Sequence, residues 1–321
     1  MSVGEVSPDQ WELLKKAGKD MQKSAELLSR EQARYLVDTY YQIQDFRIQA
    51  AGQKRASSID GEPHAVVGWV FDSMHIIEKN IQNALGRFAR SYTVGAWLQS
   101  LTGIGPVISA GLLAHLDVRD RPTAGHFWSF AGLNPNAKWE KKQKRPWNAK
   151  LKVLLWKAGE SFVKTQSLES DYYGKLFVAR KAKEWQWNLE GLNADAAVAA
   201  LDARDYGAET NARAWYSGQF TPEAAREWLD KEPRPMQPDE KNGDCGLPML
   251  PPAHVHARAR RWTEKLFLSH VHHVMYEDYY GSAPSQPYAF EQLKNEDHRH
   301  YLAPPNWPVS KAGKSLRELL G

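Results

Sequence analysis

The segment from Leu98 to Leu113 contains the residues that most clearly indicate binding of phosphate groups. It reads hydrophobic, two spacers, hydrophobic, spacer, and then Gly103-Ile104-Gly105, followed by Pro106 where a second helix can begin. Glycines in such a turn allow backbone conformations that other residues rarely adopt, and they remove side-chain bulk. The amides of the turn and of the following helix can then face one phosphate. The pattern predicts a helix-hairpin-helix whose isoleucine is anchored in the core.

Basic residues interleaved with tryptophans lie downstream of this hairpin. Residues 138–152 contain seven cations against one acid, Glu140. Cations neutralise phosphates and release counterions, and indole rings can stack on bases. Because contacts to phosphates carry no sequence information, binding is expected to be sequence-tolerant. The predicted nucleic-acid contacts are Thr102, Gly103, Ile104, Gly105, Val107, Lys138, Trp139, Lys141, Lys142, Lys144, Arg145, Trp147, Lys150 and Lys152.

Both features also have an ordinary structural interpretation. The Gly-Ile-Gly turn is compatible with a plain connection between two helices that glycines cap. The basic run is compatible with a solvated loop whose two tryptophans belong to the core. An acidic stretch over residues 184–244 either screens the basic run, mimics nucleic acid or marks the opposite face of the protein.

Sequence patterns typical of catalysis or metal binding are absent. The chain has no Gly-x-Ser-x-Gly, no P-loop and no dinucleotide fingerprint. His270 and His272 are two residues apart, so on a helix they point to different faces and chelate a metal poorly. The acids nearest the hairpin, Asp117 and Asp120, are expected to belong to an ordinary loop. We therefore predict no catalytic residue, no metal site and no cofactor, with Mg²⁺ required only if the chain is an active recombinase.

The composition is that of a globular protein without disulfides. Of the 321 residues, 42% are hydrophobic and 25% are charged, and the formal net charge is +4. The single cysteine, Cys245, excludes an internal disulfide and a Cys-rich zinc module. No apolar run is long enough to span a bilayer, and the first residues do not read as a secretory signal. These features predict a cytoplasmic, nucleoid-associated protein with no membrane partner.

Residues 1–92 are predicted to form a helical hairpin. Apolar or small residues recur at spacings of three and four, which predicts one long helix over residues 8–50. A break at residues 56–63, containing serine, glycine and proline, precedes a second predicted helix over residues 64–92. Two amphipathic helices joined by a short turn are typical of an antiparallel pair. The pair is either an intramolecular subdomain or the arm of a homodimer formed through residues 8–92.

The remaining sequence shows helical periodicity and no convincing strand, so the expected fold is all-α. Residues 93–183 are expected to form the helix-hairpin-helix domain. Residues 184–252 are an acidic insertion, with 13 acids against 6 bases over residues 184–244, and they end in a proline-rich linker. Residues 253–321 comprise a helix and an extended aromatic tail. Helices are expected at residues 126–133, 148–164, 194–204, 221–231, 254–280 and 310–320.

The hairpin and a second motif together resemble a known family. After Leu101–Leu116 the chain reads Phe127-Trp128-Ser129-Phe130-Ala131-Gly132-Leu133-Asn134-Pro135, followed by the basic run and a Leu- and Ala-rich segment at Asn148–Phe162. This order is similar to the C-terminal domain of insertion-sequence transposases of the 110/116/902 group. The resemblance implies a helical nucleic-acid-binding domain of mobile-element origin, with DNA as the partner and RNA as the alternative.

The chain departs from that family in the parts that carry catalysis. The family places a RuvC-like (RNase-H-like) catalytic domain before this region, whereas residues 1–92 read as helices. The family's nucleophilic serine lies in a Ser-Gly stretch after the Gly-Leu-x-Pro motif, whereas Asn136–Lys141 contains neither serine nor glycine. The resemblance therefore implies nucleic-acid binding and does not extend to strand transfer.

Three functions are compatible with the sequence. The first is a non-catalytic, largely sequence-tolerant DNA-binding protein that dimerises through its N-terminal helices. The second is an active transposase, recombinase or nuclease that works with a partner or a guide RNA. The third is a protein–protein interaction module whose hairpin is merely structural. Affinity for nucleic acid that falls steeply with salt favours the first, Mg²⁺-dependent strand cleavage the second, and no binding at low salt the third.

Overall fold

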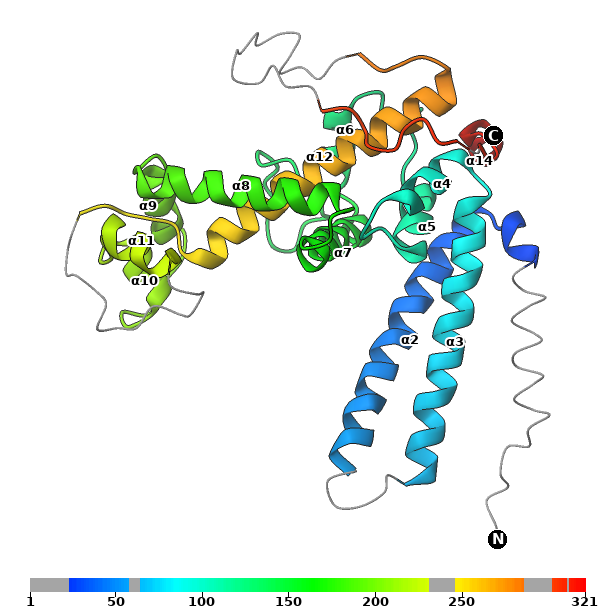
Figure 1. Cartoon of the computed structure of the whole chain (residues 1–321), viewed down its shortest axis with the longest axis horizontal. Coiled ribbons are helices and arrows are strands. Elements are labelled where there is room, and N and C mark those ends of the chain that lie inside the picture. Colours follow the sequence, from blue (N-terminus) through cyan, green and yellow to red (C-terminus); the bar gives the residue numbers. More distant parts are fainter. Residues whose placement is uncertain (1–22, 58–63, 231–245, 286–301, 311) are drawn as a thin grey trace. The chain divides into compact units, whose positions relative to one another are not determined.

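The computed structural model describes residues 23–57, 64–230, 246–285, 302–310 and 312–321, and within these ranges the protein is helical with no strand (Figure 1). The all-α prediction is therefore confirmed. The elements are η1 (Ala25–Leu27), α2 (Arg30–Ser57), α3 (Ala65–Arg90), α4 (Thr93–Ser100), α5 (Pro106–His115), α6 (Ala124–Phe130), α7 (Ala149–Thr165), α8 (Tyr172–Leu189), α9 (Ala194–Asp202), α10 (Asn211–Tyr216), α11 (Pro222–Asp230), α12 (Pro252–Tyr280) and α14 (Leu316–Leu320).

The chain divides into two compact units. The first unit comprises residues 1–161 and 267–321, and the second unit comprises residues 162–266. The first unit thus combines two segments that are distant in sequence. The four-part division expected from composition stays a prediction.

The paired helices α2 and α3 lie side by side in the first unit (Figure 1). Arg47 of α2 forms an ion pair with Glu78 of α3, a side chain with 11% exposure. Gln44 donates a second hydrogen bond to the same carboxylate at 3.2 Å. These contacts hold the two helices together along their facing sides.

The first predicted helix is interrupted. Residues 8–22 lie outside the described residues, and the helix predicted over 8–50 does not continue through Leu28 and Ser29, where α2 has not yet begun. The cause is a capping box. The Ser29 hydroxyl accepts from the Gln32 amide at 3.2 Å, and the Gln32 side chain accepts from the Ser29 amide at 2.9 Å. This reciprocal pair fixes the start of α2.

Replacing Ser29 with alanine should lower the free energy of unfolding of the first unit by about 1 kcal/mol, because the Gln32 backbone amide loses the Ser29 hydroxyl as its acceptor. Urea titration followed by circular dichroism measures the change. Ser29→Asp keeps an N-cap acceptor and should keep most of the stability. Equal midpoints for the alanine variant and the unchanged protein would contradict this assignment.

Helix α5 is the central helix of the first unit. Its residues from Ser109 to His115 are all buried, and it packs against α2, α3 and α4. Helix α7 also approaches closely, since a Cβ added at Gly111 would lie 2.6 Å from a methyl group of Leu154. The glycine therefore allows α7 to pack directly on α5. A buried central helix gives the hairpin that precedes it a rigid base.

The segment after α12 packs on the helices that flank the hairpin. The Trp97 indole of α4 donates to the Pro305 carbonyl at 2.7 Å. The Thr93 amide donates to the Lys314 carbonyl at 2.9 Å, and the Lys314 amide donates to Ser91 at 2.7 Å. Leu316, in the short helix that the sequence predicts within residues 310–320, is fully buried. These segments therefore complete the first unit around α4.

The second unit has its own aromatic core. Buried Trp185 of α8 lies with its ring centroid 5.9 Å from that of Trp215, which in turn lies 4.8 Å from Phe220. Leu250 lies just before α12. Its backbone amide donates to the Asn188 side-chain oxygen at 2.8 Å, and the Asn188 side-chain nitrogen donates to the Leu250 carbonyl at 3.0 Å. The second unit is thus built from α8, from α9 to α11, and from the first part of α12, which follows Leu250.

Candidate nucleic-acid interface

The hairpin between α4 and α5 has the special backbone conformation that the sequence predicts at Gly103 but not at Gly105, whose φ is −89°. Gly103 has φ +88°, in the left-handed region that favours glycine. The Ile104 side chain is 4% exposed and its amide donates to the Leu101 carbonyl at 3.0 Å. Ile104 therefore anchors the turn in the core, as expected, and its own amide is not available to a ligand.

The start of α5 is open to a ligand. Gly105 is the N-cap of α5, with φ −89° and ψ 178°, and no side chain caps the helix. A Cβ added at Gly105 would meet no atom within 4 Å. The helix N-terminus carries partial positive charge and unpaired amides, which together favour an anion. Val107 is buried, so it can contribute only its backbone, whereas Thr102 and Gly103 are partly exposed.

An arginine that the sequence analysis missed lies beside the start of α5. A Cβ built at Gly86 would lie 3.2 Å from Pro106 Cβ and 3.3 Å from two guanidinium nitrogens of Arg90. The Arg90 side chain is exposed and donates to the Gln99 side chain at 2.6 Å. Arg90 precedes the hairpin on α3, so its position depends on how α3 packs against α5, which local spacing does not reveal.

The basic run forms an exposed loop over residues 138–148 and continues into the first turn of α7, which contains Lys150 and Lys152. Its tryptophans are partly occupied by its own cations, with the Arg145 guanidinium 5.0 Å from the Trp139 ring centroid and the Lys152 ammonium 4.5 Å from that of Trp147. The Trp139 indole also donates to the Gln143 carbonyl at 2.7 Å. The two rings thus hold cations in place, and neither is a fully free stacking surface.

Most of the cations in the basic run form no ion pair with the residues that the structure describes. Lys150 forms an ion pair with Asp38 of α2. The other six cations of the run form no ion pair with any residue that the structure describes: Lys138, Lys141, Lys142, Lys144, Arg145 and Lys152. Five of these cations lie in the loop and Lys152 lies in the first turn of α7, and such a concentration of positive charge attracts polyanions strongly.

The hairpin and the basic loop lie at opposite ends of α5. The hairpin precedes the first residue of α5, whereas Asn148, at the end of the loop, contacts His115 in the last turn of α5 at 3.3 Å. A helix of 10 residues spans about 15 Å. The structure therefore offers two separate contacts for phosphate, one at the hairpin and one at the basic loop, although the two segments are close in sequence.

The acids near the hairpin are already engaged. Asp117 accepts from Arg30 at 2.9 Å and from Arg119 at 2.9 and 3.1 Å. Burial raises the pKa of Asp117, but the hydrogen bonds from Arg119 and Arg30 outweigh it and hold that pKa below its usual value. Asp120 is exposed and lies 3.7 Å from Arg121. Neither acid stands as a free ligand for a metal ion.

The histidine pair of α12 is part of the packing. Burial lowers the pKa values of both His270 and His272 to about 4, so both are neutral at pH 7. His270 is bonded to the Leu302 carbonyl at 2.7 Å, and His272 packs edge-on against Phe127. Across the ranges given above, no three His, Cys, Asp or Glu residues are grouped as metal ligands would be.

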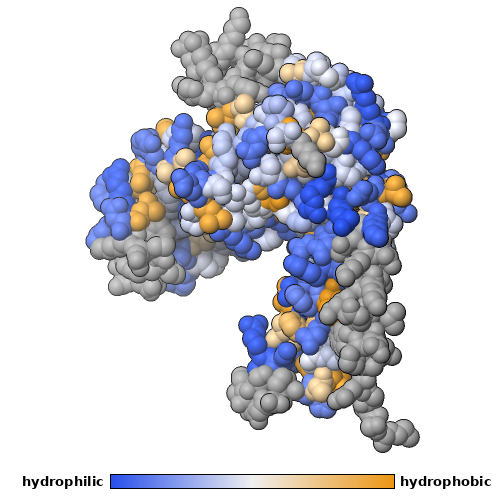
Figure 2. Space-filling view, turned by 45° about the vertical axis from the view of Figure 1, so that its right-hand side comes forward, coloured by the Kyte–Doolittle hydropathy of each residue, from blue (hydrophilic) through white to orange (hydrophobic). Residues whose placement is uncertain are grey.

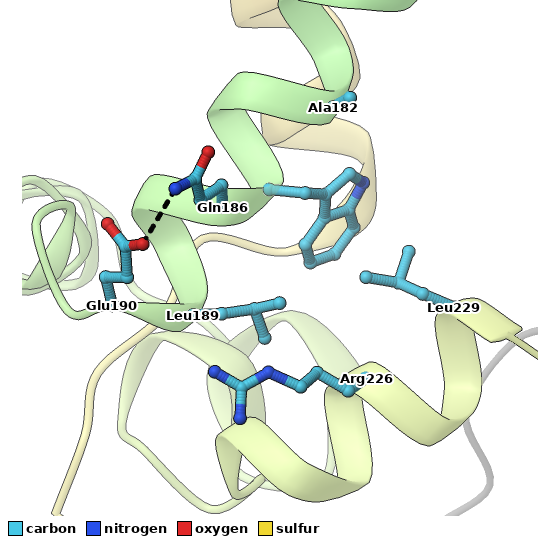
Figure 3. Close-up of a pocket in the computed structure, with 7 residues that line it drawn as sticks. Ala182, Gln186, Leu189, Glu190, Arg226 and Leu229 are labelled. Atoms are coloured by element: carbon cyan, nitrogen blue, oxygen red, sulfur yellow. Dashed lines mark hydrogen bonds between the residues drawn. The ribbon is translucent and has the colours of Figure 1, made fainter.

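The second unit contains a cavity of about 450 Å³ between α8 and α11 (Figure 3). Leu189 and Leu229 face each other across it, with the long side chain of Arg226 below them and the Gln186–Glu190 hydrogen bond of 2.9 Å at its edge. No nucleophile paired with a base is among its lining residues. The cavity is a gap between packed helices and offers no catalytic chemistry.

The hairpin and the basic loop fall within one region that is similar to a known protein family. No helix among the described residues is long and apolar enough to cross a membrane. Searches of curated proteins and of solved structures gave no match. Comparison with protein-family models matches residues 95–174, which span α4 to the first turn of α8, to the family described as Transposase IS116/IS110/IS902. The part of the chain that carries the hairpin and the basic loop is therefore related to the transposases of this family.

Proposed function

We propose that the protein binds DNA without catalysing strand transfer and largely without sequence preference. The observation that supports this most is the combination, within the transposase-related region, of an uncapped start of α5 with a basic run in which six cations form no ion pair with the described residues. The start of α5 approaches one phosphate through its amides, and the lysines of the loop neutralise others. Since both contacts are made to the backbone of the nucleic acid, the base sequence matters little.

The spacing of the two contacts sets the length of the nucleic acid. They are separated by about the length of α5, roughly 15 Å, and a DNA duplex carries a phosphate charge for about every 1.7 Å of its axis. One duplex of about five base pairs, at about 3.4 Å per base pair, can therefore reach both. Shorter duplexes should bind by the basic loop alone and with a smaller dependence on salt.

Homodimerisation through the N-terminal arm is also part of the proposal. Large hydrophobic side chains of α2 and α3 are exposed, among them Tyr35, Phe46 and Trp69, and Figure 2 shows hydrophobic groups among hydrophilic ones on the surface of the molecule. Burial of such groups against a second copy is favourable. Sedimentation equilibrium of the full chain measures the oligomer, and a monomer at micromolar concentration would contradict this part.

The relationship to transposases also supports a second candidate function, strand cleavage by this chain together with a partner or a guide RNA. Supercoiled DNA incubated with the protein and Mg²⁺ separates the two. Nicking by the purified chain would replace the binding proposal with an enzymatic one. Intact supercoils, together with a band shift that salt weakens, support DNA binding alone.

Gly105→Asp should weaken binding to a 20-base-pair duplex by at least about 10-fold while leaving the fold intact. Aspartate is a good N-cap and suits the positive end of a helix, so α5 is not destabilised. Open space surrounds the position, and its φ is ordinary for any residue. The new carboxylate nevertheless repels the phosphate that the helix start would bind. Fluorescence anisotropy at 100 mM salt measures the loss.

Gly68→Asp is the matched control for this variant. Gly68 lies near the start of α3, also has open space around it, and undergoes the same change of charge. It is about 27 Å along α3 from Gly86, which packs against Pro106. Equal affinities for Gly68→Asp, Gly105→Asp and the unchanged protein would show that the hairpin has only a structural role.

A further inference from the structure

Two helical stripes of basic and aromatic residues meet in the second unit, outside the transposase-related segment. On α8, Arg180, Lys183, Glu184 and Trp187 follow the spacing that places side chains on one face of a helix. On α12 the same spacing joins a second set of residues, and that set is Arg258, Arg261, Trp262 and Lys265. The two stripes together carry five cations and one acid.

Contacts between the stripes make them one surface. Glu184 of α8 accepts from Arg258 of α12 at 2.8 Å. The Arg180 guanidinium lies 4.7 Å from the Trp187 ring centroid and 5.3 Å from that of Trp262, so it is shared by an indole of each helix. Lys183 adds a second cation 5.0 Å from the Trp187 ring. Each indole already lies against a cation of the stripes, but both remain partly exposed, and the exposed part is what a base can contact.

The positive charge of this surface is only partly compensated. The buried Glu184 carboxylate is used by Arg180 and Arg258. Arg261 is exposed and has no carboxylate within ion-pair distance in the part of the chain that the structure describes. Burial and the charge of Arg261 lower the pKa of Lys265. Cations that crowd and repel one another in the free protein gain most when a polyanion binds.

We propose that this α8–α12 surface is a second nucleic-acid site, which binds single strands by neutralising phosphates with Lys183, Arg261 and Lys265 and by stacking bases on Trp187 and Trp262. The proposal does not depend on the hairpin or on the basic loop, since it concerns other residues in the other unit.

The aromatic residues favour a single strand over other polyanions. Bases of a duplex are stacked on one another and cannot stack on an indole, whereas each base of a single strand has a free face. Indoles also partition to anionic membrane interfaces, so vesicles containing phosphatidylserine are the competing probe in the test. Arginine next to an indole also adds cation–π attraction to a stacked base.

The test uses the full chain and fluorescein-labelled dT20, with the dT20·dA20 duplex as a second probe. Lys183→Gln combined with Arg261→Gln should weaken dT20 binding by about 10-fold and reduce the slope of log affinity against log salt by about 1.4, since each neutralised phosphate contributes about 0.7 on single strands. Arg226→Gln combined with Lys175→Gln is the control, because it removes two exposed cations of the same unit that lie off the stripes.

A second variant separates stacking from charge. Trp187→Leu should weaken dT20 binding with an unchanged salt slope, and dT20 should quench less tryptophan fluorescence in this variant than in the unchanged protein. Circular dichroism confirms that each variant is folded. The proposal fails if dT20 affinity is unchanged in both variants, or if the control pair loses as much affinity as the stripe pair. It also fails if the stripe variant loses affinity only for vesicles containing phosphatidylserine.

The duplex probe keeps this test distinct from that of the proposed function. The stripe variant should bind the duplex as tightly as the unchanged protein, and Gly105→Asp should bind dT20 almost as tightly. Loss of dT20 binding in Gly105→Asp, with no effect of the stripe variants, would place single strands at the hairpin and overturn the second site.

Discussion

Glu184→Ala should lower the free energy of unfolding of the second unit by about 3 kcal/mol. The Glu184 side chain is 1% exposed and accepts from Arg180 at 2.6 and 3.0 Å and from Arg258 at 2.8 Å. Removing it leaves two guanidinium groups facing each other without a counter-charge and opens a gap in the core. The loss lies at the low end for a buried ion pair because both arginines are partly exposed.

Urea titration followed by tryptophan fluorescence measures this change, since Trp185 and Trp215 report on the core of the same unit. Glu190→Ala is the control, because Glu190 is exposed and is bonded only to Gln186 among the described contacts. It should change stability by less than about 0.5 kcal/mol. Equal losses for the two variants would show that the Glu184 pairs contribute no more than a surface contact does.

Changing four lysines of the basic loop to glutamine should have the largest effect on DNA binding. The lysines are Lys138, Lys141, Lys142 and Lys144. If each neutralises one phosphate, the slope of log affinity against log salt should fall by about 3.6, and affinity at 100 mM salt should fall by about 100-fold or more. The four side chains are exposed and form no ion pair with the described residues, so the fold should not change.

The matched control changes four lysines on other parts of the surface to glutamine, and these are Lys23, Lys79, Lys175 and Lys181. It has the same net charge as the loop variant, so a purely global electrostatic effect would weaken both equally. Anisotropy titrations at 50, 100 and 200 mM salt give both slopes. A slope that stays unchanged in the loop variant would remove the loop from the interface.

The sequence predicted best those features that depend on local chemistry. Gly103 and Pro106 determine where the turn bends and where α5 begins, whatever packs around them. The start of α2 also depends on local chemistry, namely a serine followed three residues later by glutamine. The apolar periodicity on either side nevertheless led to the prediction of one continuous helix. The all-α class follows from the helical periodicity of the sequence, which agrees with the helices that the described residues form.

Features that depend on contacts between distant residues were not readable. Glu184 counts as one of the acids of an acidic stretch, yet its partner Arg258 lies 74 residues away. Arg90 belongs to the surroundings of the hairpin only because α3 packs against α5. The separation of the hairpin from the basic loop follows from the direction of α5, since the loop returns to the end of that helix. Composition and spacing contain none of this information.

The bond from Trp97 to Pro305 joins residues 208 positions apart, and Thr93 depends likewise on Lys314. Helix α4, which holds the hairpin, therefore acquires its last neighbours only after most of the polypeptide has left the ribosome. We expect the packing of α4, and with it the hairpin, to be completed late in synthesis, once translation has passed these residues.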